Sequence, residues 1–82
     1  MATAKVYVRY KPDVMDPQGI TVKKALETLG YKGVNKVSVG RYFLIELDGN
    51  DREAISRNVK KMSTELLSNP VIEDYTFEIE EN

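Results

Sequence analysis

The chain contains no cysteine and no histidine among its 82 residues. Without cysteine it forms no disulfide, and without either residue it lacks the usual ligands of a structural zinc ion. The same absence removes the side chains that most often act as nucleophile or proton shuttle near neutral pH, so a glutaminase-type cysteine chemistry is excluded. We therefore expect no catalytic residue and no metal site in this chain.

Glycine is also sparse, and its spacing carries no nucleotide-binding motif. The five glycines, at positions 19, 30, 33, 40 and 49, never approach a G-x-G-x-x-G or P-loop pattern. The carboxylates that remain, among them Glu73 and Asp74, fit a solvated strand edge better than an acid–base pair or a cation site. We expect no cofactor bound by this chain.

Long apolar runs are missing as well. No stretch approaches the roughly 18 apolar residues of a membrane span, and the first residues lack the apolar segment of a signal peptide. With 12 basic and 13 acidic side chains, the net charge of −1 provides no attraction to polyanions. These observations predict a cytoplasmic protein that binds neither membrane nor nucleic acid.

The short length limits the hydrophobic core. A chain of this size forms one domain, residues 1–82, and buries only about 60 to 65% of the surface that its unfolded form exposes. Because disulfides and zinc are excluded, self-association is the remaining source of additional buried surface. We expect a homodimer or a larger homo-oligomer.

Hydrophobic periodicity predicts six elements in the order β-α-β-β-α-β. Asp16 and Pro17 read as a helix start, Gly30 as its stop, Gly40 as a tight hairpin turn, and Pro70 as the end of a second helix that follows the loop at Asp48–Asp51. The expected strands cover residues 4–10, 34–39, 41–48 and 75–79. This order predicts an α+β, ferredoxin-like fold, in which two helices cover one face of a four-stranded antiparallel sheet.

The alternation within the strands assigns side chains to two sheet faces. The residues expected under the helices are Val6, Val8, Val37, Val39, Phe43, Ile45, Leu47, Tyr75, Phe77 and Ile79. The residues expected on the opposite face are Tyr7, Arg9, Tyr42 and Leu44. Two tyrosines and a leucine are more apolar surface than a solvated face usually carries, so we predict that these four residues form the homo-oligomer interface.

Several segments together resemble a known family. They are Val6–Gly19 (VYVRYKPDVMDPQG), Lys23–Leu26, Val39–Tyr42, the pair Leu66 and Leu67, and Asn69–Ile79 (NPVIEDYTFEI). In this order they resemble the PurS family, the small subunit of phosphoribosylformylglycinamidine synthase. One departure is Ser63, where relatives often carry a cysteine.

The resemblance implies a function in de novo purine biosynthesis, on the route to IMP. It implies a non-catalytic assembly subunit that bridges a glutaminase subunit and an ATP-dependent synthetase subunit for ammonia transfer. The whole complex is then an amidotransferase, a carbon–nitrogen ligase, that uses ATP, Mg²⁺ and glutamine on the other subunits. Formylglycinamide ribonucleotide would be its substrate and formylglycinamidine ribonucleotide its product.

Two loops contain most of the resemblance and are the predicted contacts with the partner subunits. Helix capping accounts for Asp16 and Pro17, but folding leaves Lys11, Gly19 and the acidic pair after Pro70 without a structural role. Loop residues that folding does not explain are where recognition tends to occur. The predicted contact residues are Lys11, Pro12, Asp16, Gly19, Asn69, Glu73 and Asp74.

Two other classes share the predicted topology. Gly40–Leu47 has some likeness to the RNA-binding octapeptide of RRM domains, with Tyr7 and Tyr42 on the strands where bases stack, but a pI near 5.4 disfavours a phosphate-binding face. A ligand-binding regulatory module of the ACT type is supported only by fold analogy. Acylphosphatase is excluded, because Lys11-Pro12-Asp13 stands where its glycine-rich loop is required.

Overall fold

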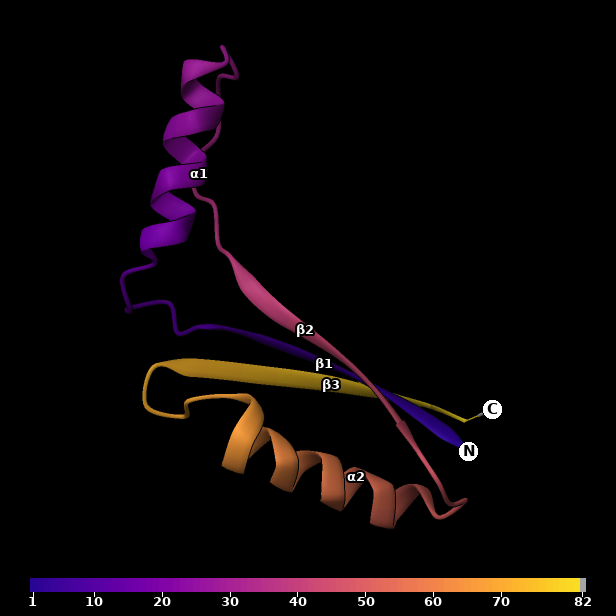
Figure 1. Ribbon diagram of the computed structural model, residues 1–82. Coiled ribbons are helices and arrows are strands. Elements are labelled where there is room, and N and C mark those ends of the chain that lie inside the picture. Colours follow the sequence, from indigo (N-terminus) through magenta and orange to yellow (C-terminus); the bar gives the residue numbers. More distant parts are fainter. Residues whose placement is uncertain (82) are drawn as a thin grey trace.

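The computed structural model describes residues 1–81, which form three strands, two α-helices and one short π-helix. The elements are β1 (Ala2–Tyr10), α1 (Pro17–Thr28), β2 (Gly40–Leu47), α2 (Arg52–Met62), η1 (Ser63–Leu67) and β3 (Glu73–Glu81). The strands make one antiparallel sheet in the order β2-β1-β3, so the first strand lies in the middle (Figure 1).

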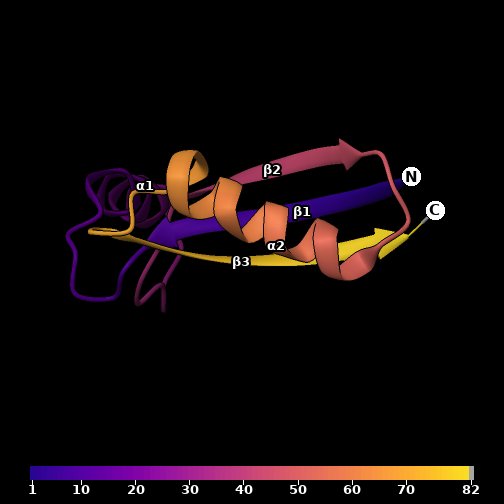
Figure 2. The same ribbon diagram turned by 90° about the horizontal axis from the view of Figure 1, so that it is seen from below.

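The hydrophobic core lies between this sheet and α2. Alternate residues of β1 are buried beneath the helix, from Ala2 to Val8, and Ile55 and Val59 cover them from α2. Figure 2 shows α2 lying along one face of the sheet. The side chains that pack around this cluster are Phe43, Ile45, Leu47, Leu67, Tyr75, Phe77 and Ile79, which confirms the predicted inward positions of the first, third and last expected strands.

The second helix ends in a π-helical turn that buries two hydroxyls. Ser63 Oγ donates to the Val59 carbonyl oxygen at 2.8 Å, and Ser68 Oγ donates to the Ser63 carbonyl oxygen at 2.7 Å. Every buried side-chain polar atom in residues 1–81 has a hydrogen-bond partner. The wider turn directs Leu67 onto the core and leaves Leu66 82% exposed.

The predicted strand 34–39 and the hairpin at Gly40 are wrong. Residues 31–39 form no strand, and the chain continues from them directly into β2. Gly40 is itself a β2 residue, paired with Arg9, and its φ is not positive; the glycines with positive φ are Gly30, Gly33 and Gly49. The chain therefore reverses after α1, at Gly30 and Gly33, and the sheet has three strands rather than four.

The expectation that both helices cover the sheet is also wrong, because α1 lies beyond the end of the sheet (Figure 1). Residues 17–39, hereafter the arm, consist of α1 and the segment that returns beside it. Gly19 is the buried residue of α1, and Val37 and Val39 are absent from the core. The Cα radius of gyration of 16.2 Å exceeds the value of about 12 Å for a compact chain of this length. The α+β class is correct, but the ferredoxin-like arrangement is not formed within this chain.

Candidate interaction surfaces

The sheet face opposite α2 carries the aromatic cluster expected from the sequence. Tyr7 pairs with Tyr42 across β1 and β2, and their ring centroids lie 5.2 Å apart. Leu44 is 58% exposed on the same face, and Arg9 is exposed two residues after Tyr7. The structure thus brings Tyr7, Arg9, Tyr42 and Leu44 onto one surface, which we call the open face.

The β3 side of the open face is acidic. Asp74, Glu78 and Glu80 alternate along this strand with the core residues. Lys5 donates to a Glu80 carboxylate oxygen at 2.7 Å, and this hydrogen bond with its charge attraction raises the pKa of Lys5 above 10.5. Carboxylates on the same face as the paired tyrosines repel phosphate, which argues against the RRM interpretation.

At the base of the arm, Asp16 contacts two separate segments. Its Oδ1 accepts a hydrogen bond from the Gly19 amide at 2.9 Å, as expected for the cap of α1. Its Oδ2 accepts from the Val39 amide at 2.8 Å, one residue before β2. The Val39 amide bond, followed by that from Gly19, lowers the pKa of Asp16 below its ordinary 3.8.

Gly19 also has a structural role, contrary to the expectation from the sequence. A Cβ at this position would collide with the Val37 carbonyl oxygen and would lie 2.9 Å from Asp16 Oδ2. The residue is buried because the returning segment passes directly over the first turn of α1. Contact between two segments of the same chain therefore accounts for a glycine at this position.

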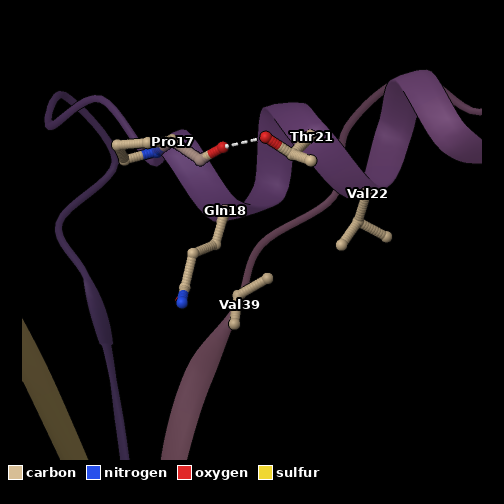
Figure 3. A pocket seen from close by; sticks show the side chains of 5 residues that line it. All are labelled: Pro17, Gln18, Thr21, Val22 and Val39. Carbon is tan, nitrogen blue, oxygen red and sulfur yellow. Dashed lines mark hydrogen bonds between the residues drawn. The ribbon is translucent and has the colours of Figure 1, made fainter.

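A shallow pocket of about 430 Å³ lies between α1 and the start of β2 (Figure 3). Val22 and Val39 supply apolar surface, Gln18 extends beside them, and the Thr21 hydroxyl is occupied by its bond to the Pro17 carbonyl oxygen. None of these lining residues is charged. This lining fits an apolar side chain better than an ionic ligand.

The loop after β1 lies beside residues 66–74, where the chain turns from η1 into the first residues of β3. We call this segment the corner before β3. The Lys11 amide donates to the Ile72 carbonyl oxygen at 2.9 Å, and Lys11, Glu73 and Asp74 line one surface pocket. Glu73 Oε1 accepts from the Asn69 amide at 2.8 Å, so part of this cluster stabilises the corner itself. Four of the seven predicted contact residues are grouped here, namely Lys11, Asn69, Glu73 and Asp74, whereas Pro12 lines a separate pocket with Asp16 and Gly19.

Two features of this corner were missed by the sequence analysis. Arg41 extends from β2 and donates to the Leu67 carbonyl oxygen at 3.0 Å, linking β2 to the corner. Leu66 and Val71 are 82% and 78% exposed, and they make the corner apolar beside its charges. The adjacent leucines at 66 and 67 were the available signal, because only one of two consecutive helical residues can face a narrow core.

Metal and membrane sites are not found in the part of the chain that the structure describes. Within residues 1–81 no three His, Cys, Asp or Glu side chains are grouped to hold a metal ion. No helix in the same range is long and apolar enough to cross a membrane.

Comparison with known proteins decides between the candidate classes. The family model of PurS, phosphoribosylformylglycinamidine (FGAM) synthase, matches residues 3–81. The chain belongs to the PurS family. The PurS subunit of Bacillus subtilis is 43% identical over 99% of this chain and 95% of its own length, and that of Synechocystis is 41% identical over 92% of this chain and 75% of its own.

Solved PurS structures have the same shape. The B. subtilis PurS crystal structure matches with a TM-score of 0.89 over 99% of this chain and all of that chain. A chain in the structure of PurLQS from Thermotoga maritima matches with a TM-score of 0.85 at 32% identity, over 98% of this chain and 99% of that one. Because these matches span nearly the whole chain, the projecting arm is part of the shared PurS structure.

Proposed function

We propose that this chain is the small assembly subunit of phosphoribosylformylglycinamidine synthase in purine biosynthesis. The observation that carries the proposal is the match to the PurS family over residues 3–81. The chain itself is non-catalytic in this proposal, because its sequence offers no cysteine or histidine and its exposed surfaces are of the kind that bind proteins. Its role is to bridge the glutaminase and the ATP-dependent synthetase in the cytoplasm.

The likeness to a chain in PurLQS supports the choice of partners. ATP, Mg²⁺ and glutamine belong to the other two subunits in this proposal, since the glycine spacing here supplies no phosphate cradle. Ammonia passes from one active site to the other only while both subunits are held together. An assembly subunit accelerates the overall reaction by maintaining that proximity.

Self-association forms the second part of the proposal. A single copy leaves apolar side chains exposed on the open face and on the arm, including Leu44 at 58% and Leu29 at 74%. The outer edge of β2 is also unpaired in the three-stranded sheet. A second copy that covers these surfaces would supply the buried area that the narrow core of one chain lacks. We propose the open face, with Tyr7, Arg9, Tyr42 and Leu44, as a homo-oligomer interface.

The corner before β3 is the proposed contact with the partner subunits. Lys11, Glu73 and Asp74 supply charges and Asn69 a neutral amide at the corner that also carries the exposed Leu66 and Val71, a mixture typical of protein interfaces. Pro12 continues the same loop. Asp16 and Gly19 were predicted to contact partners directly. Because both contact other segments of their own chain, they affect partner binding in this proposal by setting the position of the arm.

Reconstitution tests the bridging role. The synthetase and glutaminase subunits are assayed with and without this chain, using glutamine or ammonium chloride as the nitrogen source. Omission should abolish most of the glutamine-dependent turnover and should affect the ammonia-dependent turnover less, because ammonia from solution bypasses the coupling between sites. An unchanged glutamine-dependent rate would show that the chain does not bridge the two subunits.

A further inference from the structure

The arm is attached to the rest of the molecule almost entirely through its base. Helix α1 packs poorly against every other helix and strand of the described chain, and Figure 1 shows it projecting past the sheet. An element with so few tertiary contacts changes direction easily unless its attachment is rigid. The direction of the arm is therefore decided by the few residues at its base.

Asp16 is the side chain that connects the two segments of this base. Its Oδ1 binds the Gly19 amide inside the first turn of α1, at 2.9 Å. Its Oδ2 binds the Val39 amide at 2.8 Å, where the returning segment enters β2. A hydroxyl or amide side chain is sufficient to cap a helix, but only a carboxylate offers two acceptor atoms for two amides at once.

Gly19 permits this arrangement, because its missing side chain leaves room for the backbone above it. The Val37 carbonyl oxygen occupies the place that a Cβ would take. Lys23 and Lys36 line the adjacent pocket of about 250 Å³ together with Asp16, and the charge of Lys36 favours the ionised carboxylate. The helix start, the carboxylate and the strand entry thus form one closely packed joint.

We propose that Asp16 is a positioning residue, which fixes the direction of the arm relative to the sheet through its simultaneous bonds to Gly19 and Val39. The inference deepens the proposed assembly function, on which its biological meaning rests. A fixed arm presents its apolar side chains in one orientation. Binding then costs less conformational entropy than it would for a mobile helix.

Asp51 provides a matched control within the same chain. It caps α2 by accepting from the Glu53 and Ala54 amides, at 3.1 and 3.3 Å, and both of these residues belong to the helix that it caps. Replacement of Asp51 by asparagine therefore tests the capping role alone. Replacement of Asp16 by asparagine keeps a good cap but directs an amide group, a donor, at the Val39 N–H.

The direction of the arm can be measured as a distance between two spin labels. The chain has no cysteine, so labels can be placed at Lys24→Cys on α1 and Lys60→Cys on α2, which are both exposed. Dilution with unlabelled full-length chain restricts the signal to pairs within one copy. Double electron–electron resonance spectroscopy then gives the width of the distance distribution between the two labels. It is measured in the wild type, Asp16→Asn, Asp16→Ser and Asp51→Asn.

We expect a narrow distribution in the wild type and in Asp51→Asn, and a distribution about twice as wide in Asp16→Asn and Asp16→Ser. Hydrogen exchange of the Val39 amide should accelerate about tenfold in both Asp16 variants, because a bond to a charged acceptor is lost. Circular dichroism checks that each variant is folded. If Asp16→Asn does not fold, Asp16→Ser takes its place in the comparison.

Unchanged widths in both folded Asp16 variants would overturn the proposal, and so would equal widening in Asp51→Asn. The link to assembly is measured separately by sedimentation, where Asp16→Asn should raise the dissociation constant of self-association about tenfold. Widening without any change in self-association would overturn that link. A monomeric wild type would contradict the proposed homo-oligomer, whereas the label distances would still decide whether the joint exists.

Discussion

The Arg41 guanidinium donates a hydrogen bond to Glu73 Oε1 at 2.7 Å, and so connects the two outer strands across the end of β1. The same Arg41 nitrogen also donates to the Leu67 carbonyl oxygen, and the Glu73 oxygen also accepts from the Asn69 amide. The Glu73 side chain is only 11% exposed, whereas that of Arg41 is 54% exposed. This small network stabilises the corner that we propose as the partner contact.

Replacement of Arg41 by methionine should lower the free energy of unfolding by about 1–2 kcal/mol, because a largely buried carboxylate loses its charged partner. Urea denaturation measures the change. Lys61→Met is the control, since the Lys61–Glu65 pair is exposed at both ends and separated by 4.0 Å, and we expect less than about 0.5 kcal/mol there. Equal losses in the two variants would show that the network at the corner is not stabilising.

Replacement of Gly19 by alanine should destabilise the chain by about 1–3 kcal/mol, although alanine favours helices. The added Cβ collides with the Val37 carbonyl oxygen, and a backbone atom cannot move aside as a flexible side chain can. Thermal unfolding measures the loss, with Gln18→Ala, at an exposed position of the same helical turn, as the control. If Gly19→Ala is as stable as the wild type, the close contact at the joint is absent.

Alanine substitutions at two valines, one in the core and one on the arm, should change the free energy of unfolding by different amounts. Val59→Ala should cost about 2 kcal/mol in unfolding free energy, because the Val59 side chain on α2 is fully buried in the core. Val22→Ala should change the stability by less than about 0.5 kcal/mol, since Val22 on the arm is 40% exposed. Denaturation is measured at a concentration where self-association is absent. A larger loss of stability in Val22→Ala would mean that the arm packs against the sheet of the same chain.

Replacement of Leu44 by aspartate should weaken self-association at least about tenfold, because a charge would be buried in an apolar contact on the open face. Sedimentation equilibrium at micromolar concentration measures the mass, and the wild type should exceed the 9.3 kDa of one chain by a factor of two or more. Asn58→Asp, on the exposed side of α2, adds the same charge elsewhere. If both variants associate as the wild type does, the open face is not the interface.

The stability contribution of Asp16 should depend on pH in a defined direction. Its folded pKa lies below the ordinary 3.8, so the contribution is fully present above that value and is lost as the pH falls through the folded pKa. Lys23 and Lys36 are the other charged side chains around the joint. The stability difference between wild type and Asp16→Asn should therefore be constant above about pH 5 and should shrink in acid. A difference that grows in acid would contradict the assigned hydrogen bonds.

Local sequence signals determined most of the elements and their inward faces. The alternation in β1 and β3 fixes which side chains face α2, because successive residues of a strand point to opposite sides whatever the strand pairs with. Asp16, Asp51 and Pro70 mark helix ends through bonds and clashes within a few residues. For the same reason, the open face with Tyr7 and Tyr42 could be derived before the structure was known.

Only the tertiary structure decided where the chain reverses and what the arm does. Whether Gly40 turns or continues as a strand depends on its pairing with Arg9, a contact between residues far apart in the sequence. The bond from Asp16 to Val39 and the contact of Gly19 with Val37 likewise join segments that are far apart in the sequence. Periodicity and capping describe neighbours along the chain, so they identify the arm as a helix and an extended segment. The direction in which the arm points comes from contacts across space.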